Sequence, residues 1–250
     1  MAANFIVVIP ARFGSSRLPG KPLADIAGKP MIAWVYERAV RSEAKQVIIA
    51  TDDERIAEAC ADFDARVELT APDHESGTDR IAELARRCGW ADDQIVVNVQ
   101  GDEPLLPPAL ISQVATLLAR HEDADVATLV TPIQAEEWDD PHVAKVVLAR
   151  DGRALYFSRA PIPWPRDGVF KGGLRHIGIY AYRVAALNRL AATRPCELEQ
   201  RERLEQLRAL WLGMSIVTAE AREKPPPGVD TEEDLEAARR LLASSADPVP

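Results

Sequence analysis

Short apolar runs alternate with amphipathic stretches along the first half of the chain. Residues 5–9 form an unbroken apolar run, which predicts a strand buried on both faces. Apolar residues at helical spacing follow in 30–41, where Pro30 stands at the expected first turn. The pattern predicts further strands at 46–50, 66–69, 94–99 and 125–130, and further helices at 53–62, 79–87 and 108–120. Strands that alternate with helices indicate an α/β fold with a largely parallel sheet.

The pattern changes after Pro132. Apolar stretches at 145–149 and 153–158 flank Asp151-Gly152, a dipeptide typical of a tight β-hairpin. A further strand is expected at 174–183. An amphipathic helix is then expected at 198–212, followed by a strand at 215–219 and a closing helix at 231–242.

These elements predict three parts of the chain. Residues 1–132 and 213–242 are expected to form an α/β core. Residues 133–212 are expected to form an insertion of antiparallel strands and a helix, and 243–250 a flexible tail. Thr51-Asp52 is expected to cap the helix at 53–62.

Composition narrows the classes of function. The 250-residue chain is 47% hydrophobic, and its formal net charge of −9 argues against a general nucleic-acid binder. Its three cysteines are far apart and include no C-x-x-C pair, which favours a reducing compartment over a disulfide scaffold or zinc site. The run at 5–9 is too short for a signal peptide, and no stretch has the length of a membrane span. We therefore expect a cytoplasmic protein.

A basic loop follows the first expected strand. It contains Arg12, Arg17 and Lys21, with Gly14, Ser15 and Ser16 between them. Loops at the carboxyl edge of an open α/β sheet bind ligands, and three cations close together favour a polyphosphate. The loop matches neither the P-loop nor the dinucleotide fingerprint. The alternative is a solvated basic loop.

Carboxylates stand at two further positions of interest. Asp102 follows the apolar strand at 94–99, where it could bind magnesium together with substrate phosphates. The alternative is a Gly-Asp turn in which Asp102 bonds its own backbone. Asp230 precedes the closing helix and could simply be its N-cap. A shared metal role would require Asp230 to approach Asp102 in space.

Other polar groups are scattered along the chain. They occur in 74–80, 156–159, 175–180 and 205–208, and each has an ordinary structural explanation. His176 could be a structural histidine, and Glu205 could pair with Arg208 on a helix. The chain contains no G-x-S-x-G elbow and no H-x-x-x-H pair, so hydrolase and histidine-metal chemistry have no support.

Taken together, these segments resemble the 3-deoxy-manno-octulosonate cytidylyltransferase (CMP-Kdo synthetase) family. The resemblance is colinear over roughly residues 4–242. It rests on IPAR…SRLPGKPL at 9–23, HESGTDR at 74–80, VNVQGDEP at 97–104, ALYFSRAPIPW at 154–164, RHIGIY at 175–180, LEQLR at 204–208 and GVDT at 228–231.

The resemblance implies a Rossmann-like, three-layer nucleotidyltransferase fold and the reaction of CTP with Kdo to give CMP-Kdo and pyrophosphate. It implies that Asp102 and Asp230 bind Mg²⁺ and that Arg12, Arg17 and Lys21 hold the triphosphate, the four catalytic residues being Arg12, Arg17, Lys21 and Asp102. The implied nucleotide contacts are Ala11, Arg12, Gly14, Ser15, Ser16, Arg17, Lys21, Thr78 and Arg80. The implied sugar contacts are Arg80, Gln100, Arg159, His176, Tyr180, Glu205 and Gln206, with Arg80 and His176 on the carboxylate and Glu205 on hydroxyls.

The resemblance also implies a homodimer, with 174–182 and 204–211 as candidate contacts, and a role in lipopolysaccharide biosynthesis. Two alternatives stay open: CTP-dependent activation of another acidic sugar, such as a sialic acid or 8-amino-Kdo, and a non-catalytic nucleotide-binding protein on the same fold. Asp102 and Asp230 together with the basic loop favour the enzyme.

Overall fold

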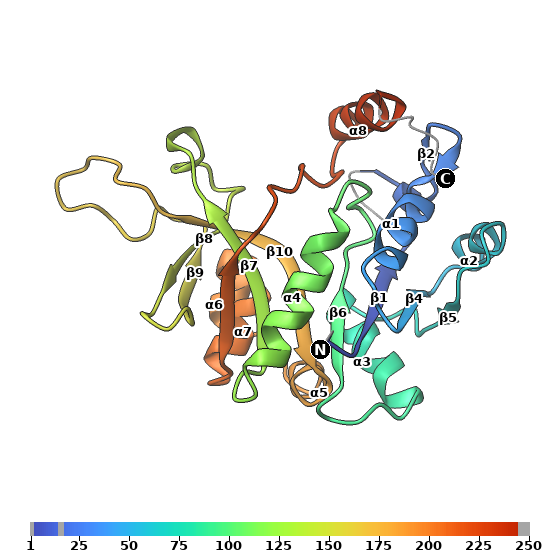
Figure 1. The fold of residues 1–250 in the computed structure, drawn as a ribbon, viewed down its shortest axis with the longest axis horizontal. Helices are drawn as coiled ribbons and strands as arrows, with labels where there is room; N and C mark the ends of the chain where they lie inside the picture. Colours follow the sequence, from blue (N-terminus) through green and yellow to red (C-terminus); the bar gives the residue numbers. More distant parts are fainter. Residues whose placement is uncertain (1–2, 15–17, 245–250) are drawn as a thin grey trace.

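The computed structural model describes residues 3–14 and 18–244, and its centre is a twisted mixed sheet (Figure 1). Within these residues the main path of the sheet has the order β11-β7-β10-β6-β1-β4-β5, and β8 and β9 extend it beside β10. The strands are β1 (Phe5–Ala11), β4 (Gln46–Thr51), β5 (Val67–Leu69), β6 (Ile95–Asn98), β7 (Val126–Pro132), β8 (Lys145–Leu148), β9 (Ala154–Ser158), β10 (Leu174–Arg183) and β11 (Ile216–Glu220).

The apolar run that begins the chain lies in the middle of the sheet. β1 pairs in parallel with β4 on one side and β6 on the other, so both of its edges are hydrogen-bonded. Phe5, Val7 and Ile9 join the core on one face, and Ile6 and Val8 join the core on the other. A strand covered on both faces needs continuous apolar sequence, which confirms the prediction for this segment.

Helices cover both faces of the sheet and make three layers (Figure 1). One face is covered by α1 (Met31–Val40), α2 (Glu54–Ala61) and α4 (Pro108–Arg120). The other is covered by α3 (Gly77–Arg87), α5 (Val184–Ala191) and α7 (Gln206–Trp211), with α6 (Glu197–Glu202) beside α7. No helix in the described ranges is both long enough and apolar enough to cross a membrane.

The last helix forms a separate small core at the carboxyl edge of the sheet. Leu235, Ala238 and Leu242 of α8 (Glu232–Ser244) pack with Ile26 and Met31. Ile26 belongs to a two-stranded hairpin made by β2 (Asp25–Ile26) and β3 (Lys29–Pro30), which follows the 3₁₀ helix η1 (Lys21–Leu23). This packing returns the C-terminal part of the chain to the end of the basic loop.

The hairpin predicted around Asp151-Gly152 is confirmed, because β8 and β9 pair antiparallel there. β10 runs antiparallel between β6 and β7 inside the main sheet. The short 3₁₀ helix η2 (Ala135–Glu137) lies between β7 and β8. Lys145 of β8 is fully buried, and its ammonium donates to the carbonyls of Asp140 and Arg159 at 2.5 and 2.9 Å. This lysine joins the two ends of the hairpin segment.

Several local predictions were wrong. The helix expected at 198–212 is two short helices, because Arg203 adopts a left-handed backbone (φ 52°) that ends α6. Asp53 rather than Thr51-Asp52 caps α2, accepting a hydrogen bond from Arg55 N. Helix α5 had not been predicted. The expected tail at 243–250 overlaps α8 at 243 and 244, and 245–250 lie outside the described residues.

Replacing Leu110 with Ala tests the placement of the core. Leu110 is fully buried in α4, so truncation should lower the free energy of unfolding by about 2–5 kcal/mol through lost burial and a residual cavity. Urea unfolding followed by circular dichroism measures the change. The matched control is Leu69→Ala on β5, where the side chain is 48% exposed and the change should stay within about 0.5 kcal/mol. Equal losses in both variants would contradict the placement.

Candidate active site

A cavity of about 290 Å³ lies where β1 and β6 end, beside the N-terminus of α3. Five segments that are separated in the sequence surround it: the end of β1, the start of η1, the stretch that leads into α3, the turn after β6 and the stretch before α8. The lining residues are Pro10, Ala11, Arg12, Lys21, Pro22, His74, Glu75, Ser76, Gly77, Arg80, Gln100, Gly101, Asp102 and Asp230. Seven predicted site residues are thereby brought together: Ala11, Arg12, Lys21, Arg80, Gln100, Asp102 and Asp230.

Two glycines let these segments approach one another. A Cβ on Gly101 would lie 2.9 Å from the carbonyl oxygen of Pro10, and a Cβ on Gly77 would lie 3.0 Å from the Pro10 ring. Both contacts are tighter than real Cβ atoms normally make, so a side chain at either position would push the cavity walls apart. Neither glycine was among the predicted site residues, because the contact partner of each lies far away in the sequence.

The two candidate metal carboxylates meet at the wall of this cavity, on either side of one lysine. Lys21 Nζ donates to Asp102 Oδ2 at 2.7 Å and to Asp230 Oδ1 at 3.2 Å. Its third partner is the carbonyl of Val229 at 2.8 Å. The approach of Asp230 to Asp102, on which a shared metal role depended, is therefore observed. Lys21 was expected to hold phosphate, and in this structure it neutralises the carboxylates.

The donor set at this wall suits magnesium that also has ligands from a substrate. No group of three or more His, Cys, Asp or Glu side chains arranged for a metal occurs in residues 3–14 and 18–244. A pair of carboxylates is nevertheless the usual protein contribution to magnesium that is also bound by phosphates. Asp102 and Asp230 have partly exposed side chains, at 33% and 51%, so their oxygens are accessible from the cavity.

The basic loop is described in part. Arg12 is exposed and lines the cavity, and among the described residues beyond its chain neighbours no atom lies within 4 Å of the position that a Cβ on Gly14 would take. The predicted contacts Ser15, Ser16 and Arg17 lie outside the described residues. Phe13 packs against Gly20, and the guanidinium of Arg55 lies 3.4 Å from the centre of its ring. This cation–π contact holds the start of the loop against α2.

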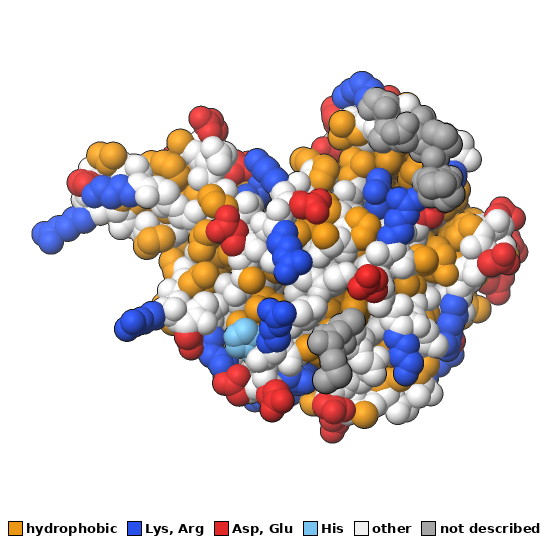
Figure 2. Space-filling view, in the orientation of Figure 1, with side chains coloured by type: hydrophobic (Ala, Val, Ile, Leu, Met, Phe, Trp, Pro, Cys, Tyr) orange, Lys and Arg blue, Asp and Glu red, His pale blue; other side chains and the backbone are white. Residues whose placement is uncertain are grey.

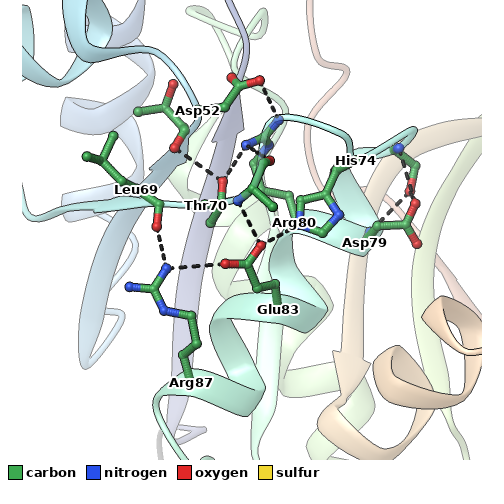
Figure 3. Close-up of polar contacts among 11 residues, drawn as sticks. Asp52, Leu69, Thr70, His74, Asp79, Arg80, Glu83 and Arg87 are labelled. Carbon is green, nitrogen blue, oxygen red and sulfur yellow. Dashed lines mark hydrogen bonds and ion pairs between the residues drawn. The ribbon is translucent and has the colours of Figure 1, made fainter.

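Polar contacts fix the segment before α3 (Figure 3). Arg80, which is 3% exposed, donates to Thr70 Oγ1 and forms an ion pair with Asp52 at 3.3 Å. The Arg80 guanidinium is thus part of the cavity wall rather than a freely moving side chain. Ser76 and Asp79 form a capping box that starts the helix.

Glu83 joins this segment to the second turn of α3. Its carboxylate accepts from the backbone N–H of Ala71 at 2.9 Å, contacts His74 Nε2 at 2.5 Å and accepts from Arg87 (Figure 3). These contacts hold the pKa of Glu83 below its usual value, against the opposing effect of burial. Glu83 was not predicted as a site residue. Its partners Ala71 and His74 lie in the connection between β5 and α3, and they become its neighbours only in the folded chain.

A second polar cluster joins the start of α3 to the start of α7, on the same face of the sheet. Thr78 donates to Glu205 Oε2 at 2.7 Å, and Glu205 also accepts from Arg208 at 2.8 Å. The rings of His176 and Tyr180 are 5.2 Å apart. Burial raises the pKa of the Tyr180 hydroxyl well above its ordinary value, and the Glu205 carboxylate adds to the rise. Thr78, His176, Tyr180 and Glu205, predicted from four separate segments, therefore belong to one region.

Two predicted sugar contacts have other surroundings. Gln206 is 8% exposed, and its amide nitrogen has no hydrogen-bond partner among the described residues. Arg159 donates to the carbonyl of Glu202 at the end of α6, at 2.6 Å, and to the carbonyl of Pro141 before β8, at 2.8 Å. Its guanidinium is therefore held by backbone carbonyls. The structure does not bring Arg159 into contact with the other predicted sugar ligands.

The imidazole of His176 is electrostatically distinctive. Burial, followed by the nearby charge of Arg175, lowers its pKa to about 3, so the ring is uncharged at neutral pH. Its Nε2 is 3.0 Å from Thr128 Oγ1, and that hydroxyl is also 2.7 Å from the carbonyl of Ile179. Because the Thr128 proton goes to a carbonyl, Nε2 donates to Oγ1. This leaves Nδ1 of His176 as a hydrogen-bond acceptor.

A smaller cavity of about 80 Å³ lies next to the carboxylate wall. It is lined by Glu103, Thr131, the start of β10 at 175–178 and the proline-rich stretch at 224–228. Burial raises the pKa of Glu103 to about 7, and the negative charges of Asp102 and Asp230 contribute to the rise. Negative charge is therefore concentrated where the turn after β6 meets the segment before α8.

Charge on the face drawn in Figure 2 shows no such concentration. On the face drawn in Figure 2, acidic and basic side chains are interspersed over the described elements, without a continuous basic patch. This distribution agrees with the net charge of −9.

The fold and the site together define a nucleotidyltransferase: a three-layer α/β sheet with a basic loop after its first strand and paired carboxylates at its carboxyl edge. A family model described as cytidylyltransferase matches residues 6–216.

Known proteins narrow the family further. A 3-deoxy-manno-octulosonate cytidylyltransferase of Pseudomonas fluorescens is 56% identical over 252 residues, which cover 97% of this chain and 99% of the relative. Its counterpart from Vibrio vulnificus is 55% identical over 251 residues, covering 97% and 100%. A solved structure of CMP:2-keto-3-deoxy-manno-octonic acid synthetase complexed with CTP superposes with a TM-score of 0.91 at 44% identity, covering 97% of this chain and 99% of its own. The chain belongs to the 3-deoxy-manno-octulosonate cytidylyltransferase family, which confirms the resemblance and the predicted fold class.

The neutral state of His176 predicts a pH dependence of stability. Below pH 6.5 an unfolded histidine binds a proton, whereas the folded imidazole does not until about pH 3. The free energy of unfolding therefore falls as the pH falls through this window. Between pH 7.5 and 5, wild type should lose about 2 kcal/mol more than His176→Asn, at about 1.4 kcal/mol per unit of pKa difference.

Urea unfolding at the two pH values measures this difference. His142→Asn is the control, since His142 is exposed in the segment before β8 and should not change the slope. Identical pH slopes in wild type and His176→Asn would contradict a neutral imidazole in the folded protein.

Proposed function

We propose that this enzyme transfers the cytidylyl group of CTP to Kdo and releases pyrophosphate. The observation that carries the proposal is the cavity at the ends of β1 and β6, where Arg12 and Lys21 stand beside the paired carboxylates Asp102 and Asp230. Relatives that are 55–56% identical over 97% of this chain carry the name of this activity, which supports Kdo as the sugar.

The reaction breaks one phosphoanhydride bond of CTP and forms one phosphoester bond to the sugar. The anomeric hydroxyl oxygen of Kdo bonds to the α-phosphorus of CTP, the bond from this phosphorus to the bridging oxygen of the β-phosphate breaks, and the hydroxyl proton is lost to solvent. Both substrates are anions, so catalysis depends on positioning and on neutralising charge. Arg12 and Lys21 stand on the cavity wall where they can offset the charge of a bound triphosphate.

We propose that the metal is Mg²⁺ and that Asp102 and Asp230 hold it. When bound, the ion would neutralise phosphate charge and lower the pKa of the sugar hydroxyl. Asp102 comes from the turn after β6 and Asp230 from the segment before α8, and Lys21 contacts both of them in the absence of substrate. The predicted site residues include no general base beside Asp102 and Asp230, so we assign no side chain to proton abstraction.

Two observations support a changed assignment of the proposed sugar contacts. A neutral His176 with a free acceptor at Nδ1 suits a sugar hydroxyl better than a carboxylate. Glu205, an acceptor held by Thr78 and Arg208, suits a hydroxyl as well. We therefore propose that the acid group of the sugar is recognised by Arg80, Gln100 or the positive end of α3, and that His176, Tyr180, Glu205 and Gln206 recognise its hydroxyls.

Arg80 and Thr78 also keep their proposed place at the nucleotide, together with Ala11, Gly14 and the loop residues Ser15, Ser16 and Arg17. Arg159 keeps its proposed role only if substrate replaces the carbonyls that hold it, since its guanidinium already has partners.

We propose that the enzyme is cytoplasmic, because Cys60, Cys88 and Cys196 are free thiols. The product would serve lipopolysaccharide biosynthesis.

Pyrophosphate release from CTP tests the function. With Mg²⁺ and Kdo, the wild type should release pyrophosphate, and omission of Kdo or chelation of the metal should stop it. N-acetylneuraminate and 8-amino-Kdo serve as competing sugars. Faster turnover with either would transfer the assignment to that acid, and no release with any sugar would favour a non-catalytic nucleotide-binding protein.

Asp102→Asn tests the carboxylate pair in the same assay. Loss of one ligand charge should lower kcat by at least about 100-fold, the scale of losing one strong electrostatic contact to the transition state. Asp92→Asn, at an exposed position before β6, is the matched control and should leave kcat unchanged. Thermal unfolding checks that both variants are folded. Near-normal turnover in Asp102→Asn would refute the metal assignment.

We also propose a homodimer that uses the outer side of α7. Of the two stretches considered from the sequence, 174–182 is a central strand paired on both edges, whereas 204–211 ends at Trp211, which is 61% exposed. Large exposed aromatic side chains are enriched at protein interfaces. Trp211→Glu should therefore halve the mass in light scattering coupled to gel filtration. Val40→Glu, at a 51% exposed position on α1, should leave it unchanged. A monomeric wild type would contradict the dimer.

A further inference from the structure

The ammonium group of Lys21 is saturated by the carboxylate wall. It has three N–H donors, and the structure supplies three acceptors: Asp102 Oδ2 at 2.7 Å, the Val229 carbonyl at 2.8 Å and Asp230 Oδ1 at 3.2 Å. Its side chain is only 12% exposed, so water has little access to take the place of these acceptors. Lys21 is therefore the counter-ion of the Asp102 and Asp230 carboxylates.

The position of this ammonium conflicts with a metal ion on the same oxygens. Magnesium binds carboxylate oxygens at about 2.0–2.1 Å. An ion shared by Asp102 and Asp230 would lie in the region between them that Lys21 Nζ occupies, and two cations at such short range repel strongly. Lys21 must withdraw before the pair can bind the ion.

Withdrawal is costly unless Lys21 finds other anionic partners. Its starting position is partly buried, and moving it away would leave two neighbouring carboxylates without a counter-charge. A polyphosphate in the cavity beside Arg12 would offer new partners within the reach of a flexible lysine.

We propose that Lys21 controls the order of binding: in the absence of nucleotide it excludes divalent cations from Asp102 and Asp230, and it releases the pair when a nucleotide polyphosphate takes over its ammonium group. This inference rests on the proposed function for the nature of the anion, but the exclusion of metal is a property of the enzyme alone. The ion then enters together with the nucleotide rather than before it. Binding of metal alone would neutralise the pair without assembling the reactants.

Titration with Mn²⁺ in the absence of nucleotide tests the exclusion directly, with free Mn²⁺ followed by electron paramagnetic resonance. The wild type should bind Mn²⁺ weakly at this site. Lys21→Met removes the competing charge with similar side-chain length, and should bind Mn²⁺ at least tenfold more tightly. Lys21→Arg keeps the charge and should bind as weakly as the wild type. The double variant Lys21→Met with Asp102→Asn should lose the gain, which assigns it to the carboxylate pair.

Thermal unfolding of the same proteins provides a second readout. Mn²⁺ alone should raise the Tm of Lys21→Met by more than that of the wild type, because a ligand stabilises the folded state that binds it. Equal Mn²⁺ affinity in folded wild type and Lys21→Met would overturn the proposal, as would a gain that survives Asp102→Asn. These measurements use no CTP and no sugar, so failure of the pyrophosphate assay would refute the proposed function and leave this result interpretable.

Discussion

A single ammonium group between two carboxylates joins three distant segments of the chain into one site. Lys21 comes from η1, Asp102 from the turn after β6, and Asp230 from the segment before α8. Without the lysine, two like charges would face each other at a partly buried wall, and Val229 and Asp230 would lose their hydrogen bonds to the ammonium group. Burial raises the pKa of the neighbouring Glu103 to about 7, and the same negative charge adds to the rise. The site is thus arranged around an excess of negative charge that requires a cation.

The sheet makes this arrangement possible through close approach of backbone. Because β1 and β6 are adjacent and parallel, the loops that follow them leave the sheet at one edge. Gly101 passes the carbonyl of Pro10 at a distance that allows no side chain, and Gly77 starts α3 against the Pro10 ring. The segment that leads into α3 is held by ion pairs and hydrogen bonds of Arg80 and Glu83 (Figure 3). Close backbone approach and charged side chains therefore both fix the shape of the cavity.

The sequence predicts those features that depend on the local pattern of apolar and polar residues. The continuous apolar run of β1 and the periodicity of α4 identified elements whose burial follows from their own residues. The prediction was wrong where the backbone departs from the local pattern. Arg203 ends α6 with a left-handed backbone, although the residues around it continue a helical pattern. Likewise, the predicted set contained Lys21, Asp102 and Asp230 but not the contacts among them. The roles of Gly77, Gly101 and Glu83 had no local signal, because each depends on a partner supplied by the folded sheet.

Lys21 and Asp102 stabilise each other in the protein before any ligand binds. A double-mutant cycle in the free energy of unfolding, with Lys21→Met, Asp102→Asn and the double variant in metal-free buffer, measures this coupling. We expect a favourable coupling energy of about 1–3 kcal/mol, with Lys21→Met destabilising the wild type more than it destabilises Asp102→Asn. A coupling energy indistinguishable from zero would show that the ammonium group does not hold the carboxylate pair.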